Sequence, residues 1–209
     1  KIPVGGFYKL VLSDGTKVWL NADSELKYPV RFVGGKREVY LKGEGYFQVS
    51  KDSCRQFIVH LQNSEITVLG TAFNVSAYED EAHVYTTLEE GRVAFYSRQN
   101  KQRILLKPGM QSDMEVATGK TVVSEVDPSL YSAWIEGRFV FQSLDLESIL
   151  RQLQRWYDFE VFFQQQEVKN YRFRGVLSRD MDIRQALDII EETTDLKFDI
   201  KGKTILVRK

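Results

Sequence analysis

The sequence predicts an α+β chain in which an all-β domain over residues 1–132 precedes a small α/β module over residues 133–209. Two observations support this prediction. Turn signals recur about every ten residues through the first part and separate runs of β-branched and aromatic residues, which is typical of β domains. After Asp127-Pro128-Ser129 the apolar period changes to that of amphipathic helices alternating with strands.

We expect the first part to consist of short strands joined by tight turns. Asp14-Gly15 lies between two apolar runs and predicts a hairpin with a type I′ turn. Gly43-Glu44-Gly45 predicts another turn, and a change of apolar phase near Gly70 indicates a β-bulge in one long strand. A sandwich, a roll and a solenoid-like stack all fit this pattern. The expected strands are Val18–Leu20, Glu38–Leu41, Tyr46–Val49, Phe57–Leu61, Ile66–Tyr78, Val84–Leu88, Val93–Ser97, Ile104–Leu106 and Thr121–Val123.

The second part is expected to contain two amphipathic helices, each beginning at an aspartate. Asp145 and Asp182 precede apolar residues at helical spacing and can accept hydrogen bonds from first-turn N–H groups. The two stretches match at a constant offset of 37 residues, the spacing of these aspartates, which indicates an internal repeat. The order is β-α-β followed by β-α-β-β, and the two halves are expected to cover each other's apolar faces. The expected strands are Phe139–Phe141, Glu160–Phe163, Tyr171–Leu177, Leu196–Ile200 and Thr204–Val207.

Composition and motifs argue against several classes of function. The 29 Lys and Arg residues balance the 29 Asp and Glu residues, so no global field favours nucleic acid or an anionic membrane as the main partner. The Gly-Lys-Thr triplets at residues 119–121 and 202–204 lack the upstream glycine of a phosphate-binding loop. With His60 and His83 as the two histidines and Cys54 as the single cysteine, we expect no metal, no cofactor and no enzymatic activity.

A glycan-binding β module without a signalling role is the alternative that the residues leave open. Aromatic side chains can stack on sugar rings, although a β domain also uses them in its core and in cross-strand pairs. The aromatic residues concerned are Trp19, Tyr40, Tyr46, Phe47, Phe73, Tyr78, Tyr85, Phe95 and Tyr96.

Several motifs closely resemble those of the FecR family of transmembrane anti-sigma factors. The resemblance is carried by residues 12–21 (LSDGTKVWLN), 43–49 (GEGYFQV) and 68–75 (VLGTAFNV), and residues 88–93 and 106–109 also fit. Residues 133–141 (AWIEGRFVF) resemble the junction into the family's C-terminal module. That module is similar to the short N-terminal domain of secretins and TonB-dependent transporters, the STN domain. The content of Tyr and Phe is most similar to that of Bacteroidetes members.

The resemblance implies a signalling role in the periplasm. Family members carry a cytoplasmic anti-sigma segment and one transmembrane helix before the region resembled here, so we expect the periplasmic portion of a single-pass inner-membrane protein. Its expected partner is the N-terminal signalling domain of a TonB-dependent outer-membrane transporter, commonly of the SusC type in Bacteroidetes. The chain is expected to relay ligand status to an extracytoplasmic-function sigma factor through the cytoplasmic segment.

Strand addition is the mode of recognition that the residues favour. An exposed sheet edge leaves N–H and C=O groups unpaired, and these groups can pair with a strand of the partner. A contact through a loop or through the β domain is the alternative. The candidate edges are Tyr171–Leu177 and Thr204–Val207, with Arg172, Arg174, Val176, Thr204, Ile205, Leu206 and Val207 as the expected partner-binding residues.

Overall fold

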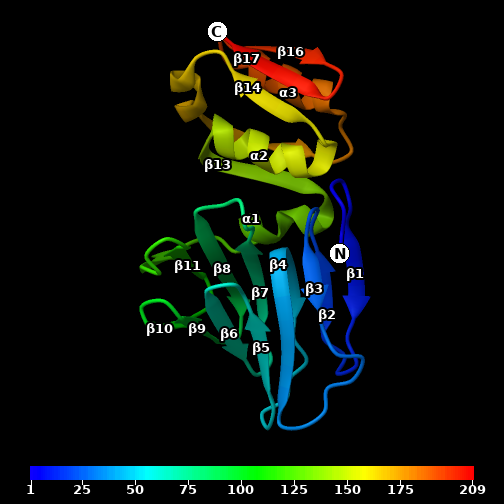
Figure 1. Ribbon diagram of the computed structural model, residues 1–209, viewed down its shortest axis with the longest axis vertical. Helices are drawn as coiled ribbons and strands as arrows, with labels where there is room; N and C mark the ends of the chain where they lie inside the picture. Colours follow the sequence, from blue (N-terminus) through cyan, green and yellow to red (C-terminus); the bar gives the residue numbers. More distant parts are fainter. The chain divides into compact units, whose positions relative to one another are not determined.

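One long strand, β4 (Lys36–Gln48), links the strands of the N-terminal part into a single curled sheet (Figure 1). The computed structural model describes all residues from 1 to 209. They divide into a β unit, Lys1–Ser132, and an α/β unit, Ala133–Lys209. No helix in either unit has both the length and the apolar character that a membrane span requires.

The sheet of the β unit has twelve strands, and its main path runs β10-β9-β6-β5-β4-β7-β8-β11-β12. The curling brings inward-facing side chains into one core, where the Phe47 ring lies 5.3 Å from Phe73 and 6.3 Å from Phe57. The β-rich character predicted for this part is confirmed, and a short helix, α1 (Ser129–Ser132), ends the unit. The other strands are β1 (Tyr8–Val11), β2 (Lys17–Leu20), β3 (Glu25–Lys27), β5 (Gln56–His60), β6 (Ser64–Val68), β7 (Ala72–Ala77), β8 (His83–Glu90), β9 (Val93–Ser97), β10 (Arg103–Leu106), β11 (Met110–Glu115) and β12 (Thr121–Glu125).

The turn predicted at Gly43-Glu44-Gly45 is wrong, because β4 continues through this segment. Gly43 has a φ of 85°, and a Cβ at this position would lie 2.4 Å from Ser24 Oγ. The glycine therefore bends the strand without ending it. The first part of β4 pairs in parallel with β5, and its last part pairs antiparallel with β2 and β7.

The single bulged strand predicted for Ile66–Tyr78 is also wrong, because the segment forms two strands with different partners. β6 pairs with β5 and β9, whereas β7 pairs with β4 and β8. Gly70 lies between them with a φ of 156°, and a Cβ there would lie 2.8 Å from Lys51 Cα. The change of apolar phase therefore marks the crossing of the chain from one part of the curled sheet to another.

The hairpin predicted at Asp14-Gly15 is confirmed, but its turn is not of type I′. Val11 on β1 pairs with Lys17 on β2, and Gly15 N–H donates to the Leu12 carbonyl at 2.9 Å. Gly15 has a φ of 85°, whereas Asp14 does not have a positive φ, so the loop is a turn followed by one left-handed glycine.

The α/β unit has the predicted order of elements. β13 and β15 form a two-stranded antiparallel sheet, and β14, β17 and β16 form a three-stranded sheet with β17 in the middle. After the short helix η1 (Ala133–Glu136), the elements are β13 (Arg138–Asp145), α2 (Leu146–Tyr157), β14 (Glu160–Phe163), η2 (Gln166–Asn170), β15 (Arg172–Ser178), α3 (Ile183–Glu192), β16 (Lys197–Lys201) and β17 (Thr204–Arg208).

Both longer helices begin at the predicted aspartates. The Asp145 carboxylate accepts from Ser148 N–H at 2.8 Å, and the Asp182 carboxylate accepts from Gln185 N–H at 2.9 Å. Gln185 Oε1 accepts in return from Asp182 N–H at 3.0 Å, which completes a capping box. The apolar faces of the two helices meet the strands in one core, which includes Ile149, Leu150, Leu153, Ala186, Leu187, Ile190, Phe198, Ile205 and Val207.

Candidate partner-binding surface

The motifs that carry the family resemblance form polar contacts within the β unit. The Glu44 carboxylate on β4 accepts from Asn21 Nδ2 at 2.6 Å and from Asn74 Nδ2 at 2.9 Å, so it joins residues of three motifs. The Tyr46 hydroxyl donates to Glu89 Oε2 at 2.8 Å. Burial raises the pKa of Tyr46, and the neighbouring Glu89 raises it further. These contacts hold strands of the sheet together.

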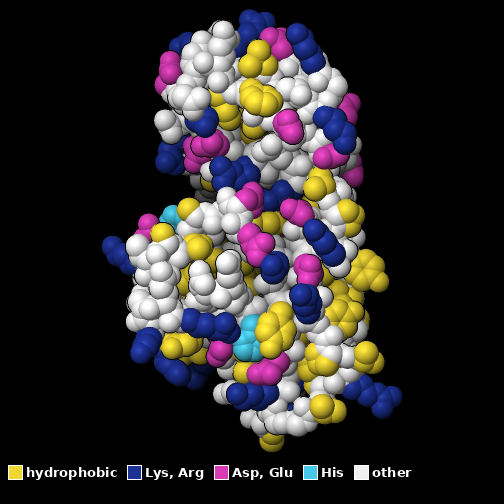
Figure 2. Space-filling view, in the orientation of Figure 1, with side chains coloured by type: hydrophobic (Ala, Val, Ile, Leu, Met, Phe, Trp, Pro, Cys, Tyr) yellow, Lys and Arg dark blue, Asp and Glu magenta, His cyan; other side chains and the backbone are white.

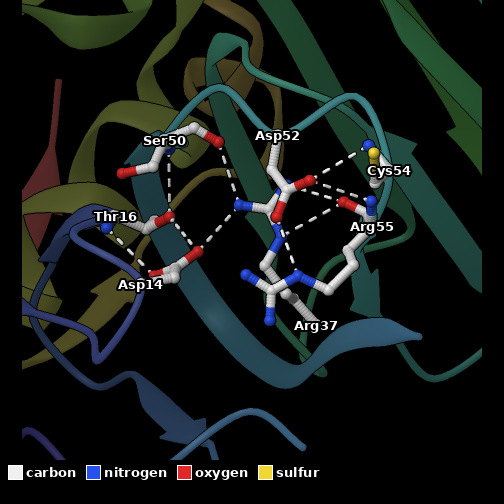
Figure 3. A network of polar contacts seen from close by, with 7 residues as sticks. All are labelled: Asp14, Thr16, Arg37, Ser50, Asp52, Cys54 and Arg55. Carbon is white, nitrogen blue, oxygen red and sulfur yellow. Dashed lines mark hydrogen bonds and ion pairs between the residues drawn. The ribbon is translucent and has the colours of Figure 1, made fainter. Parts of the chain in front are cut away.

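A buried positive charge, Arg37, connects three segments of the β unit (Figure 3). Its Nη1 lies 2.8 Å from Asp14 Oδ2 and also donates to the Ser50 carbonyl at 2.9 Å. Its Nε and Nη2 both donate to the Arg55 carbonyl, at 3.2 and 2.9 Å. Asp14 in turn accepts from the N–H and hydroxyl of Thr16. The network therefore joins the first hairpin, β4 and the loop before β5.

His60 lies on β5, His83 lies on β8 and Cys54 lies in the loop before β5, so the two histidines and the cysteine do not form one group. His60 stacks on Tyr40 with ring centroids 4.7 Å apart, and His83 Nδ1 lies 2.5 Å from Asp113 Oδ1. Cys54 is an exposed free thiol. No three His, Cys, Asp or Glu side chains are grouped so that they could hold a metal ion.

Most of the aromatic residues weighed for sugar stacking contribute to the core. Tyr40 is exposed but has His60 on its ring. Tyr85 stacks on His83, and the Arg103 guanidinium lies 5.0 Å from the ring centre of Tyr96. The buried members of the set are Trp19, Tyr46, Phe47, Phe73, Tyr78 and Phe95.

β15 has one open edge, because it pairs with β13 alone. Its solvent-facing side chains are Arg172, Arg174 and Val176, and Val176 is 56% exposed. Arg172 Nη1 donates to the Ser143 carbonyl at 2.6 Å, whereas no contact occupies the guanidinium of Arg174. Three of the residues predicted to bind a partner therefore lie together at an accessible edge.

The hydrogen-bond register shows which backbone groups of β15 face outward. Arg179 N–H donates to the Gly137 carbonyl at 2.8 Å, directly beyond the last residue pair of the β13–β15 ladder. In an antiparallel pair, hydrogen-bonded and non-hydrogen-bonded positions alternate. The N–H and C=O groups of Val176 and Arg174 consequently point away from β13 and can accept a further strand.

The prediction that Thr204–Val207 is an exposed edge is wrong. β17 is the central strand of its sheet, since it pairs in parallel with β14 and antiparallel with β16. Its backbone groups are therefore used on both sides. Ile205 and Val207 are buried in the core, whereas Thr204 and Leu206 lie on the opposite face of the sheet.

The edge of β16 is protected by side chains of α3. Glu191 Oε1 accepts from Phe198 N–H at 2.7 Å, and Arg184 Nη1 donates to the Phe198 carbonyl at 2.9 Å. Partial burial works to raise the pKa of Glu191, but the Phe198 N–H and the ammonium of Lys197 outweigh it and lower the pKa. Polar side chains that occupy edge groups in this way hinder the addition of another strand.

An apolar pair that was not predicted from the sequence lies on the outer face of the three-stranded sheet. Phe162 on β14 is opposite Leu206 on β17, and the two side chains are 54% and 38% exposed. Asp199 on β16 lies next to Leu206 and pairs with Arg208 at 2.7 Å. The period-two alternation of Glu160–Phe163 is the signal that places Phe162 on this face.

Comparison with known proteins identifies relatives of both units. The family model described as FecR protein matches residues 1–94, and the model described as FecR, C-terminal, matches residues 138–207. A crystal structure of a candidate anti-sigma factor from Parabacteroides distasonis matches with a TM-score of 0.92 and 25% identity, covering 100% of this chain and 97% of that chain. A second crystal structure with the same description has a TM-score of 0.90 and 25% identity, with coverage of 100% and 96%. No curated protein matches the sequence.

Proposed function

Because the chain belongs to the FecR family, we propose that it is the periplasmic sensor portion of a transmembrane anti-sigma factor. In this proposal the α/β unit is an STN-like module that binds the N-terminal signalling domain of a TonB-dependent outer-membrane transporter of the SusC type. The β unit is the FecR-type periplasmic domain. Occupancy of the transporter is relayed through an inner-membrane anchor and a cytoplasmic segment to an extracytoplasmic-function sigma factor.

The observation that carries the proposed contact is the open edge of β15. Arg174 and Val176 direct backbone groups away from β13, and their side chains, with that of Arg172, lie on the exposed face. A partner strand can add there through main-chain hydrogen bonds, while alternate side chains give specificity. The two arginines favour a partner strand with carboxylates facing them, so we expect the affinity to fall as the salt concentration rises.

A proline substitution tests this edge without breaking the sheet. Val176→Pro removes an N–H that faces away from β13, a position at which edge strands tolerate proline. Val140→Pro is the matched control, because Val140 lies opposite Val176 on β13 and its N–H points to the other side. Both variants should keep the far-ultraviolet circular dichroism spectrum of the wild-type chain.

The affinity of each variant is measured by titration against the isolated signalling domain encoded beside this protein. We expect Val176→Pro to weaken binding at least tenfold and Val140→Pro to leave it nearly unchanged. Equal affinities for the wild-type chain and a folded Val176→Pro variant would exclude the β15 edge. Binding of the transporter's cargo, with no binding of the signalling domain, would overturn the proposed function itself.

A further inference from the structure

The loop between β3 and β4 holds two valines almost fully in solvent. Val30 is 89% exposed and Val33 is 85% exposed. Between them, Phe32 turns inward, where its ring lies 6.0 Å from that of Phe57 in the core. Because the inward Phe32 side chain packs on the core and anchors the loop, the side chains of Val30 and Val33 on either side of it point into solvent.

The same loop carries a positive charge without a matching carboxylate. Residues 28–36, which are this loop and the first residue of β4, include Arg31 and Lys36 and no acidic residue. Neither cation takes part in an ion pair, and both are exposed. The chain as a whole has no net charge, so the combination of free cations and solvent-facing valines is a local property.

The neighbouring loop at this end of the β unit, residues 49–55, carries two cations and one carboxylate. Lys36 pairs with Gln56 at the start of the parallel strands β4 and β5, so the loops that precede the two strands lie at the same end (Figure 1). In the second loop, the Asp52 carboxylate is occupied by Arg55 at 2.8 Å (Figure 3). The exposed Lys51 lies 4.0 Å from Glu90 Oε1. Figure 2 shows apolar and basic side chains over this end of the unit, with acidic side chains beside them.

We propose that the loop over residues 28–36 docks the β unit onto an anionic lipid bilayer. Val30 and Val33 enter the headgroup region, and Arg31 and Lys36 contact lipid phosphates. Apolar residues flanked by cations favour such a surface, because burial of the apolar groups and attraction to anionic lipids act together. An anionic surface repels free carboxylates, and those of Asp14 and Asp52 are bound by Arg37 and Arg55.

Vesicle binding of the full 209-residue chain tests the proposal, with Cys54 as a natural reporter. Cys54 is the single cysteine, is exposed and lies in the loop beside the proposed contact, so a fluorophore that responds to polarity can be attached there. The probes are vesicles of phosphatidylcholine alone and of phosphatidylcholine with one third phosphatidylglycerol. The test variant is Val30→Ser/Val33→Ser, and the control is Val122→Ser/Val123→Ser, which removes two exposed valines from β12.

We expect binding to vesicles that contain phosphatidylglycerol, a blue shift of the Cys54 label, and weaker binding in 0.5 M NaCl. The Val30→Ser/Val33→Ser variant should bind about tenfold less tightly, and Arg31→Gln/Lys36→Gln should lose about fivefold for each charge. The control should bind like the wild-type chain. Absence of binding to the anionic vesicles, or equal binding by the valine variant, would overturn the proposal. Since no protein partner is present, this outcome is independent of the transporter experiment.

Discussion

The buried Arg37–Asp14 pair permits a quantitative prediction about the stability of the β unit. The Arg37 side chain is 0% exposed and that of Asp14 is 5% exposed, so neither charge has water to replace a lost partner. Asp14→Ala leaves the guanidinium buried with two carbonyl groups as its remaining hydrogen-bond partners. Arg37→Met leaves the carboxylate with its contacts to Thr16.

Removal of one member of a buried ion pair costs about 3–5 kcal/mol, chiefly because the other charge is left without compensation. We therefore expect Asp14→Ala to lower the free energy of unfolding of the β unit by about 3–5 kcal/mol. The double variant Arg37→Met/Asp14→Ala should cost clearly less than the sum of the two single variants, since it leaves no isolated charge. Glu79→Ala is the control, because the Glu79–Lys42 pair is more than half exposed, and it should cost no more than about 1 kcal/mol.

Urea unfolding followed by the fluorescence of Trp19 measures these free energies. Trp134 and Trp156 belong to the α/β unit, so phenylalanine at both positions makes the signal specific for the β unit. The cost of Asp14→Ala should change little in 0.5 M NaCl, because salt screens exposed charges far more than buried ones. A cost as small as that of Glu79→Ala, or additivity in the double variant, would refute the reasoning.

Two further predictions concern the kink of β4 and the edge of β16. Gly43→Ala should lower the free energy of unfolding of the β unit by about 2 kcal/mol or more, because φ at this position is positive and the new Cβ would meet Ser24. In urea unfolding, the added substitution Ser24→Gly should recover only part of this loss, since it removes the contact and leaves φ unchanged. Full recovery would contradict the role of φ. Glu191→Gln should destabilise the α/β unit near pH 7, because the Phe198 N–H and the Lys197 ammonium stabilise the charged Glu191 carboxylate by more than its partial burial destabilises it. Because the pKa of Glu191 is lowered in the folded protein, the carboxylate adds to the free energy of unfolding above the ordinary pKa of 4.5, and this contribution is lost as the pH falls. The difference in the free energy of unfolding between the wild-type chain and Glu191→Gln should therefore shrink below about pH 4.5. A difference that stays constant from pH 7 to pH 3 would contradict this assignment.

Features decided within a few residues could be predicted from the sequence. The capping aspartates Asp145 and Asp182 and the hairpin at Gly15 depend on short-range hydrogen bonds and backbone preferences, and the structure contains all three. The prediction at Gly43 recognised a special backbone conformation but assigned it to a turn. A kinked strand and a turn both use a glycine with positive φ, and distant partner strands decide between them.

The errors arose where pairing between distant segments decides the outcome. β11 was not predicted, because its sequence is polar; its Gln111 is nevertheless buried and donates to the Thr87 hydroxyl at 2.7 Å. The α/β unit shows the same limit. Arg174 lies at an open edge as expected, but Ile205 lies at the centre of a sheet, because β14 pairs in parallel with β17 on the side that β16 leaves open. No local pattern distinguishes these two strands.

The position of β17 also has a consequence for the two halves of the α/β unit, β13-α2-β14 and β15-α3-β16-β17. β14 belongs to the first half, yet its one strand partner is the last strand of the second half. A nascent chain that has completed only the first half therefore has no template for β14, and that segment must wait until β17 has been synthesised. The two halves have similar orders of elements but depend on one shared strand, so neither is a module that could be excised or exchanged by itself.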